Sequence, residues 1–232
     1  NFLDLVALGT IADLVPLDKN NRTMVAHGLK LIKKNKSKPG IYALLNQAGR
    51  QLSKLTSSDL SFAVAPRLNA AGRLTDMSLG IECLLTDDEG DAIEIAGKLN
   101  RLNTERRQIQ DDMQEEALAE LEKYLQDTSG EIPYGICIYN KDWHQGVVGI
   151  LASKIKEKFN RPAIVFAKEN EGVLKGSARS IAGLHIKDVF DELATLHPEL
   201  ILTFGGHAMA AGLTIKESQY SNFSNIFNEL VN

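Results

Sequence analysis

The first part of the chain repeats apolar residues every three or four positions, which is the period of a helix. Residues 2–17 form a largely apolar run in which the carboxylates of Asp4 and Asp13 are embedded. Amphipathic patterns follow, and one of them begins with serine and aspartate, which favour helix starts. Helices are predicted over residues 20–36, 39–49, 57–74 and 78–85. The pattern therefore predicts a helical region.

A single long helix is predicted from residue 91 to residue 126, a stretch without proline. Its apolar residues form a narrow stripe with steps of three or four positions, interrupted at Arg106. These residues are Ala96, Leu99, Leu102, Ile109, Met113, Ala117, Leu121 and Tyr124. At a rise of ~1.5 Å per residue such a helix reaches ~50 Å, far beyond the average globular helix. We expect it to bridge two domains.

Apolar strands alternate with amphipathic helices beyond residue 133. Strands are predicted over residues 134–139, 163–167, 173–179, 200–204 and 213–215, with helices ending near Phe159 and spanning 185–196 and 218–230. This alternation is typical of an α/β domain, here with a mixed sheet of about five strands. We expect a helical domain over 1–90, a connecting helix over 91–127 and an α/β domain over 128–232.

Composition adds little to this picture and excludes two classes of protein. Apolar residues make up 44% of the 232 residues and charged residues 24%, as in ordinary globular proteins. No apolar run is long enough for a membrane span, and no secretory signal is evident. Cys83 and Cys137 stand alone in apolar surroundings, which indicates reduced core residues and a cytoplasmic protein. The net charge of -4 argues against a wholly basic surface but not against a local basic groove.

Two stretches of the helical region carry candidate chemistry. Asp13 lies in an apolar run, where a carboxylate needs a partner or a metal, although an aspartate at a helix end explains it as well. Arg67, Asn69 and Arg73 surround a run of alanine and glycine. Arginine forks beside small residues suit an anion that approaches the backbone. The alternative is an ordinary helix end, with Gly72 as its C-cap and the arginines on the surface.

A glycine-rich stretch near the C-terminus reads Gly205-Gly206-His207, followed by small residues. We predict that these glycines turn the chain from a strand into a small-residue helix, whose N-terminus would face an anion. His207 would then donate a hydrogen bond to a phosphate oxygen or transfer a proton. A strand-to-helix turn with a capping histidine is the structural alternative.

Two further polar stretches lie where predicted strands end, and strand ends are where α/β sheets bind ligands. His144 follows the first strand, in the sequence Trp-His-Gln-Gly. Ser177, Arg179 and Ser180 end the third strand. An arginine flanked by two hydroxyls suits a terminal phosphate, because the guanidinium binds two oxygens and the serines donate to the others.

Five motifs occur in a fixed order along nearly the whole chain: LDLVALGTIADLVPL, RLNAAGRL, DWHQGVVGI, GSARS and GGHAMAAG. With these motifs the sequence resembles the RecJ family of single-strand-specific DNA exonucleases, within the DHH phosphoesterase superfamily. The resemblance implies the end of a DHH domain, a long helix and a DHH-associated domain. It also implies two divalent metals, Mn²⁺ or Mg²⁺, single-stranded DNA as the substrate and other DNA-repair proteins as partners.

The resemblance assigns roles to the candidate residues. Asp13 matches a late metal-binding and catalytic aspartate, and His207 matches a catalytic histidine that faces the phosphodiester. Substrate binding falls to the remaining candidates: Arg67, Asn69, Arg73, His144, Ser177, Arg179, Ser180, Gly205 and Gly206. The Asp-x-Asp and Asp-His-His motifs that supply most metal ligands in the family do not occur in these residues. The chain begins at Asn1, without a methionine, and we expect it to be a piece of a larger enzyme whose metal site is incomplete here.

The expected function is hydrolysis of single-stranded DNA from its 5′ end in repair and recombination, by metal-activated water. An alternative in the same superfamily is a phosphodiesterase for short oligonucleotides or cyclic dinucleotides. A second alternative is a non-catalytic nucleic-acid-binding module. The length of the connecting helix and the arginine motif favour the exonuclease over the phosphodiesterase. The stretch around Asp13 argues against a pure binding module, which would not need a carboxylate placed for a metal.

Overall fold

The computed structural model describes residues 2–127 and 131–232. By its internal contacts the chain divides into two compact units, an N-terminal unit of residues 1–107 and a C-terminal unit of residues 108–232. This division falls inside the long helix, between the two domain boundaries expected from the sequence. Those boundaries stay a prediction, and each unit is described by itself.

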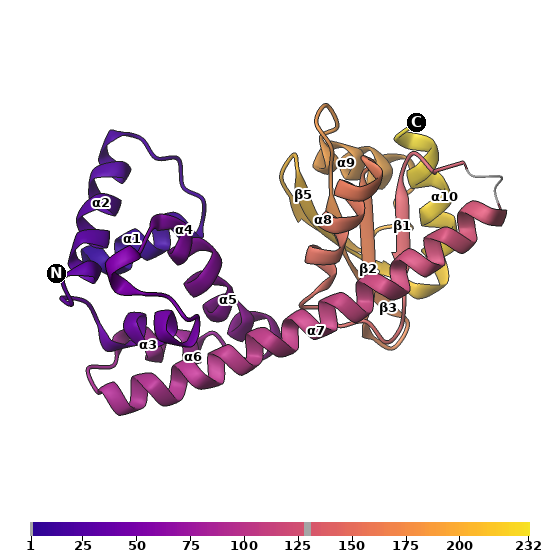
Figure 1. Ribbon diagram of the computed structural model, residues 1–232. Helices are drawn as coiled ribbons and strands as arrows, with labels where there is room; N and C mark the ends of the chain where they lie inside the picture. The colour runs from indigo at the N-terminus through magenta and orange to yellow at the C-terminus, as the bar shows by residue number, and fades with distance from the viewer. Residues whose placement is uncertain (1, 128–130) are drawn as a thin grey trace. The chain divides into compact units, whose positions relative to one another are not determined.

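The described part of the N-terminal unit is helical, as predicted (Figure 1). Its elements are α1 (Leu3–Ala12), α2 (Lys19–Lys33), α3 (Pro39–Gln47), a 3-10 turn (Leu52–Lys54), α4 (Ser57–Asp59), a π-helical turn (Leu60–Val64), α5 (Ala65–Leu74) and α6 (Ser78–Leu85). Their apolar faces meet in one core, where Ile32, Leu44 and Leu60 are fully buried. The apolar residues that recur at helical spacing in the sequence therefore form the buried faces of these helices.

The start of α4 is fixed by a capping box. The Asp59 carboxylate accepts hydrogen bonds from the backbone N–H of Thr56 at 2.8 Å and from its hydroxyl at 2.9 Å. These bonds satisfy donors that a helix N-terminus leaves without partners. They also hold the pKa of Asp59 below its usual value, the Thr56 N–H having the largest effect. Beyond the π-helical turn the helix continues to Leu74, so Gly72 is not its C-cap.

Helix α7 (Glu89–Asp127) is continuous over 39 residues and confirms the long helix. Its first turn is acidic, and Asp88 accepts a hydrogen bond from the Asp91 N–H at 2.8 Å. Ala96 and Leu99 pack in the core of the N-terminal unit, whereas Met113 and Ala117 pack in the C-terminal unit. Within the described ranges, no helix is both long and apolar enough to cross a membrane.

The C-terminal unit contains a five-stranded mixed sheet, as predicted. The strands are β1 (Ile136–Tyr139), β2 (Ala163–Asn170), β3 (Val173–Arg179), β4 (Thr203–Gly206) and β5 (Ala210–Lys216), in the order β1-β2-β3-β5-β4. Only the pairing of β1 with β2 is parallel among these strands. The run predicted over 173–179 matches β3 residue for residue.

The two faces of the sheet have different covers. Helices α9 (Ile186–Leu196) and α10 (Tyr220–Leu230) pack on the first face, against apolar side chains of β2, β3 and β5. Helix α8 (Val148–Phe159) and the second part of α7 pack on the other face, α8 over β2 and β3 and α7 against the same core as β1. On that second face, Ser177 and Arg179 of β3 and the residues paired with them on β5 and β4 form a part with small side chains and one arginine. We call this part the small-residue face; its members are Ser177, Arg179, Ala210, Gly212 and Gly205.

The glycine-rich stretch is a β-hairpin, which corrects the predicted turn into a helix. Gly206 ends β4 with φ of 148°, and a Cβ there would lie 2.4 Å from the Ala211 Cα atom. The His207 N–H donates to the Ala210 carbonyl at 2.8 Å and closes the turn. Residues 210–212 then pair with β3. The alanines of this stretch favour a helix on their own, but here a strand partner and the glycine required at position 206 decide the conformation.

Candidate nucleic-acid interface

Ser177 and Arg179 lie side by side on the small-residue face. They are two positions apart on β3, so both side chains project from the same side of the sheet. Arg179 Nη1 donates to Ser177 Oγ at 3.0 Å and to the carbonyl oxygen of Ala178 at 2.8 Å. These bonds hold the guanidinium close to the sheet surface, and both side chains are half-buried.

Gly149, in the first turn of α8, approaches this pair closely. A Cβ at Gly149 would lie 3.0 Å from Arg179 Nη2 and 3.0 Å from Ser177 Oγ, so a larger residue would force the two groups to move. Among the described residues, no side chain caps the N-terminus of α8. The positive end of a helix dipole therefore lies beside an arginine and a hydroxyl, an arrangement suited to an anion. We call Gly149, Ser177 and Arg179 the anion cradle.

The loop from Asn140 to Val147 joins β1 to α8 and carries His144. The His144 ring nitrogen Nδ1 accepts a hydrogen bond from the Gly146 N–H at 3.0 Å, and the rest of the ring is exposed. Trp143 is 5% exposed, and its indole Nε1 donates to Glu116 Oε2 of α7 at 2.6 Å. The sequence patterns singled out neither Glu116 nor Gly149 as a residue of the site. Gly149 could have been found as a glycine in the first turn of a predicted helix, whereas the pairing of Glu116 had no sequence signal.

The hairpin residues form the far part of the small-residue face. Gly205 pairs with Gly212, and Gly212 pairs with Ser177, so these three residues form one row across β4, β5 and β3. A Cβ at Gly205 would meet no atom within 4 Å. Gly206, by contrast, packs against the backbone of β5, and His207 is exposed at the tip. The glycine row leaves backbone open on the sheet surface, while Gly206 has a structural role.

Ser180 does not join Ser177 and Arg179, contrary to the expectation of two hydroxyls around one arginine. It is 1% exposed, and its hydroxyl donates to the Leu184 carbonyl at 2.7 Å. Its N–H donates to the Met209 carbonyl at 3.0 Å. Since β3 ends at Arg179, the backbone no longer presents Ser180 on the sheet surface. Ser180 fixes the next loop to the hairpin instead.

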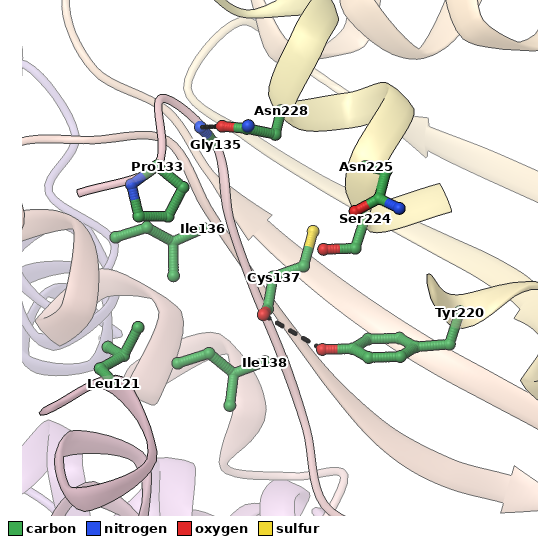
Figure 2. Close-up of a pocket in the computed structure, with 10 residues that line it drawn as sticks. All are labelled: Leu121, Pro133, Gly135, Ile136, Cys137, Ile138, Tyr220, Ser224, Asn225 and Asn228. Atoms are coloured by element: carbon green, nitrogen blue, oxygen red, sulfur yellow. Dashed lines mark hydrogen bonds between the residues drawn. The ribbon is translucent and has the colours of Figure 1, made fainter. Parts of the chain in front are cut away.

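A pocket of about 240 Å³ lies at the β1 edge of the sheet, apart from these residues (Figure 2). Its polar contacts are internal: the Tyr220 hydroxyl donates to the Cys137 carbonyl at 3.1 Å, and the Gly135 N–H donates to Asn228 Oδ1 at 3.1 Å. Burial raises the pKa of the Cys137 thiol to about 12, which makes it a poor nucleophile. None of the candidate residues lines this pocket.

In the N-terminal unit the Arg67 side chain is held by hydrogen bonds to other residues of the same unit. Its guanidinium donates to Asn100 Oδ1 at 2.9 Å, to the Ala63 carbonyl at 2.6 Å and to the Gln47 carbonyl at 3.4 Å. It thereby joins α5 to α3 and α7. Burial, followed by the charges of two other arginines, Arg107 and Arg50, lowers its pKa.

Asn69 and Arg73 lie one turn apart on α5, and both are exposed. Residues four positions apart share a face of a helix. These two side chains can therefore contact one ligand together. Arg67 belongs to the same motif but is half-buried beneath the helix packing.

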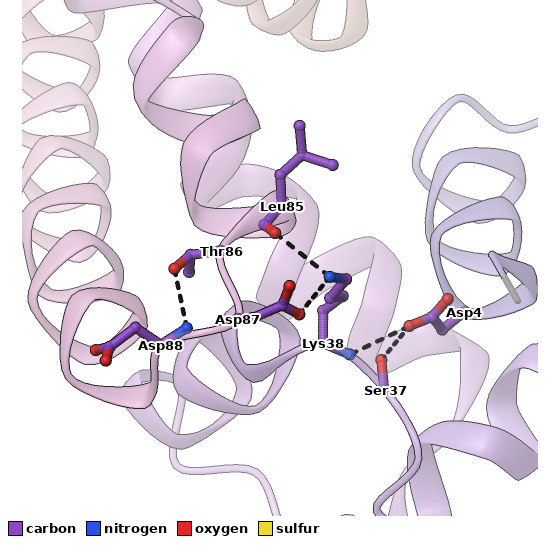
Figure 3. Close-up of polar contacts among 7 residues, drawn as sticks. All are labelled: Asp4, Ser37, Lys38, Leu85, Thr86, Asp87 and Asp88. Carbon is purple, nitrogen blue, oxygen red and sulfur yellow. Dashed lines mark hydrogen bonds and ion pairs between the residues drawn. The ribbon is translucent and has the colours of Figure 1, made fainter.

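The two carboxylates of the first apolar run have opposite environments. Asp4 is 2% exposed, and its Oδ2 accepts from the Ser37 hydroxyl at 2.5 Å and from the Lys38 N–H at 3.3 Å (Figure 3). Lys38 Nζ in turn pairs with Asp87. Asp4 thus has the partner that a buried carboxylate needs.

Asp13 is exposed at the C-terminal end of α1, followed by Leu14 at a positive φ of 53°. Leu14 and Phe62 are 81% and 74% exposed, and they border a groove of about 260 Å³. In the part of the chain that the structure describes, no three His, Cys, Asp or Glu side chains are grouped to hold a metal. Asp13 can supply one oxygen ligand, but the described residues do not form a two-metal site by themselves.

Comparison with known proteins identifies relatives of both units. Residues 132–232 match the DHHA1 domain family. The chain is 54% identical over 229 residues to the single-stranded-DNA-specific exonuclease RecJ of Escherichia coli, covering 99% of this chain and 40% of that protein. It is 36% identical over 229 residues to the Bacillus subtilis protein of the same name, covering 98% of this chain and 28% of that protein. The chain thus spans less than half the length of these relatives.

Solved structures agree with the sequence matches. The crystal structure of RecJ in complex with Mn²⁺ from Thermus thermophilus superposes with a TM-score of 0.84 at 31% identity, covering 99% of this chain and 32% of that one. A crystal structure of an exonuclease RecJ bound to manganese gives a TM-score of 0.81 at 31% identity, covering 99% and 54%. The resemblance inferred from the five motifs and the mixed α/β fold are confirmed.

Proposed function

Because the chain corresponds over its whole length to part of RecJ, we propose that it belongs to an exonuclease that degrades single-stranded DNA from the 5′ end. Its C-terminal unit would bind the end of the strand, and its N-terminal unit would contribute part of the catalytic domain. The observation that carries the proposal is the anion cradle, which combines three favourable features for a terminal phosphate within one unit.

The cradle matches the chemistry of a 5′-phosphate. The Arg179 guanidinium offers a planar fork of N–H donors, Ser177 offers a hydroxyl, and Gly149 leaves room beside the positive end of α8. A terminal phosphate carries more charge than an internal diester, so a cationic site favours the end of a strand over its interior. Ser180 takes no part in this proposal, because its hydroxyl is buried.

The glycine row gives the strand a surface to lie on. Gly205 and Gly212 have no side chains, so the sugar-phosphate backbone can approach the sheet and reach the exposed His207. We propose that His207 contacts the phosphodiester to be cut, where an imidazole can donate to an oxygen or transfer a proton. His144, exposed in the loop before α8, would contact the strand near its end.

In the N-terminal unit, we propose that Asn69 and Arg73 contact the strand and that Arg67 supports the helix that presents them. Asp13 would be one ligand of the divalent metals. The RecJ structures from Thermus thermophilus contain Mn²⁺ or Mg²⁺, and the whole enzyme is proposed to use either. When bound, such metals activate water and neutralise phosphate charge. The other ligands would come from outside these residues.

We extend the proposal to a cytoplasmic enzyme that acts together with other DNA-repair proteins. Its support is that Cys83, which is buried, and Cys137, which is half-buried, form no disulfide. Free, buried cysteines are ordinary in a reducing compartment.

The test compares 5′-phosphorylated with 5′-hydroxyl single strands in the full-length enzyme. Arg179→Ala is expected to weaken binding of the phosphorylated strand by about 10- to 150-fold and of the hydroxyl strand much less, because a charge-assisted bond is lost. Arg161→Ala is the matched control, since Arg161 stacks on the Tyr134 ring in the same unit. Both titrations are made at one ionic strength. Equal weakening of the two strands by Arg179→Ala would contradict the assignment.

A further inference from the structure

Trp143 is a buried residue in a loop whose neighbouring side chains are exposed. The loop connects β1 to α8, and His144 and Gln145 in it are open to solvent. The indole ring packs in the core formed by α7, α8, β1 and β2. Its Nε1 atom donates to Glu116 Oε2 at 2.6 Å, which fastens the loop to α7.

Internal hydrogen bonds join the loop to the start of α8. The Trp143 N–H donates to the Asn140 carbonyl at 3.3 Å, and the Val147 N–H donates to the His144 carbonyl at 3.0 Å. The Gly146 N–H donates to the His144 ring at 3.0 Å. A shift of Trp143 would therefore displace His144 and the first turn of α8.

Trp143 belongs to the same buried core as Met113 and Ala117, and its hydrogen bond to Glu116 adds a directional contact to this apolar packing. A hydrogen bond to a carboxylate is directional and stronger than a neutral one. A second contact joins the loop to the sheet, because Gln145 Nε2 donates to the Lys168 carbonyl of β2 at 2.9 Å. Two polar contacts thus fix the loop, one to β2 and one to α7.

We propose that Glu116 is a positioning residue for strand binding. By orienting Trp143, it positions His144 in the loop and the Gly149 turn of α8 beside Ser177 and Arg179. Glu116 itself does not touch the strand. This inference rests on the proposed function of the anion cradle and adds a residue to it that lies outside the cradle, on the helix that continues into the N-terminal unit.

The sign of the expected effect separates positioning from general electrostatics. Removing a carboxylate from a protein strengthens its binding of a polyanion if charge alone matters. The positioning role predicts the opposite for Glu116→Ala. Glu116→Gln removes the same charge but keeps an oxygen that accepts from the indole. Glu115→Ala, at an exposed neighbouring position on α7, is the matched control for charge.

The experiment measures the affinity of the 232-residue chain for a 5′-phosphorylated and for a 5′-hydroxyl single strand by fluorescence anisotropy at one ionic strength. Glu116→Ala and Trp143→Phe should each weaken binding of the phosphorylated strand by about 3- to 10-fold. The effect is smaller than for Arg179→Ala, because these changes alter the position of the loop and remove no direct contact with the phosphate. The double variant should be no weaker than either single one, because both remove the same bond. Glu116→Gln and Glu115→Ala should bind as tightly as the unchanged chain or more tightly.

Trp143 is the only tryptophan of the chain, so its emission reports on the loop without any strand. The emission should shift in Glu116→Ala and not in Glu115→Ala. If the unchanged chain binds and Glu116→Ala binds as tightly as Glu115→Ala, the inference is wrong and the cradle stands. If the unchanged chain shows no preference for the 5′-phosphorylated strand, the proposed function fails and the inference fails with it.

Discussion

The two units use their candidate residues in different ways. In the C-terminal unit, sheet register brings together residues that are far apart in the sequence: Gly149, Ser177 and Arg179 meet, and Gly205 lies in the same row as Ser177. Of the candidates in the N-terminal unit, only the neighbours Asn69 and Arg73 share an exposed helix face. Arg67 is bound by three oxygens of its own unit, while Asp13 lies exposed at a helix end. A motif in a sheet can complete a site by pairing, whereas a motif on a helix presents one face and needs a partner.

The largest expected difference between the two units is in catalysis, because the described residues of the N-terminal unit form no complete metal site. The 232-residue chain is expected to cleave no single-stranded DNA in Mn²⁺ or Mg²⁺, because one exposed aspartate cannot hold two metals. The same chain should still bind the 5′-phosphorylated strand through its C-terminal unit. Cleavage is followed with a labelled oligonucleotide. Metal-dependent degradation that is abolished by Asp13→Ala would show that the N-terminal unit completes a site after all.

The two adjacent glycines of the hairpin are expected to have different roles, Gly206 in stability and Gly205 in strand binding. Gly206→Ala should lower the free energy of unfolding by about 3 kcal/mol, because its φ of 148° and its contact with Ala211 both exclude a Cβ. Gly205→Ala should change it by only about 0.5 kcal/mol, since no atom lies within 4 Å of the added Cβ. Urea unfolding measures both. The same Gly205→Ala protein should bind single strands more weakly, because its methyl group projects from the glycine row.

A corresponding pair of arginines lies in the N-terminal unit. Arg67→Ala should destabilise that unit by about 2–3 kcal/mol, because it removes the buried stem and leaves three oxygens without a donor. Arg73→Ala, on the exposed face of α5, should change stability much less and instead weaken strand binding by the full-length enzyme. Urea unfolding and anisotropy separate the two effects. If Arg73→Ala were the more destabilising change, the division between a supporting and a contacting arginine would be reversed.

Sequence patterns predicted the elements whose conformation is set by local periodicity. The stripe of α7 and the strand of β3 were found because their apolar residues recur with the period of a helix or a strand. Residues 205–212 were misassigned because alanine and glycine carry little periodic information, and a strand partner more than 25 residues away decides their pairing. The burial of Ser180 and the contact of Trp143 with Glu116 depend on tertiary packing in the same way. No local pattern encodes them.

Gly149→Ala should affect binding and stability in opposite directions. In a helix, alanine is favoured over glycine by about 0.5–1 kcal/mol, so stability should stay the same or rise. The added Cβ would lie 3.0 Å from Arg179 Nη2 and from Ser177 Oγ, and it should push both groups out of place. We expect the preference for a 5′-phosphorylated strand to fall by about 5-fold in the full-length enzyme, roughly 1 kcal/mol. An unchanged preference would show that the first turn of α8 does not border the phosphate.

The smallest expected effect belongs to Asp59, whose role is structural and confined to the N-terminal unit. Bonds from Thr56 lower its pKa from a reference value of 3.8, so its carboxylate stabilises the folded state above that reference and loses this contribution as the pH falls through the lower folded value. Asp59→Asn should cost about 0.3–0.5 kcal/mol at pH 7, because the amide oxygen can still accept from Thr56 and only the negative charge near the helix N-terminus is lost.

Urea unfolding of the two proteins at several pH values measures this difference. It should stay constant from pH 7 down to about pH 5 and shrink below the reference value, because the wild-type carboxyl group then becomes neutral like the amide. Strand binding at pH 7 should be the same for both proteins, because Asp59 satisfies a helix end and is not a proposed contact of the strand. A difference in stability that grew on acidification would mean that Asp59 is favoured in its protonated form, and its assignment as a capping carboxylate would be wrong.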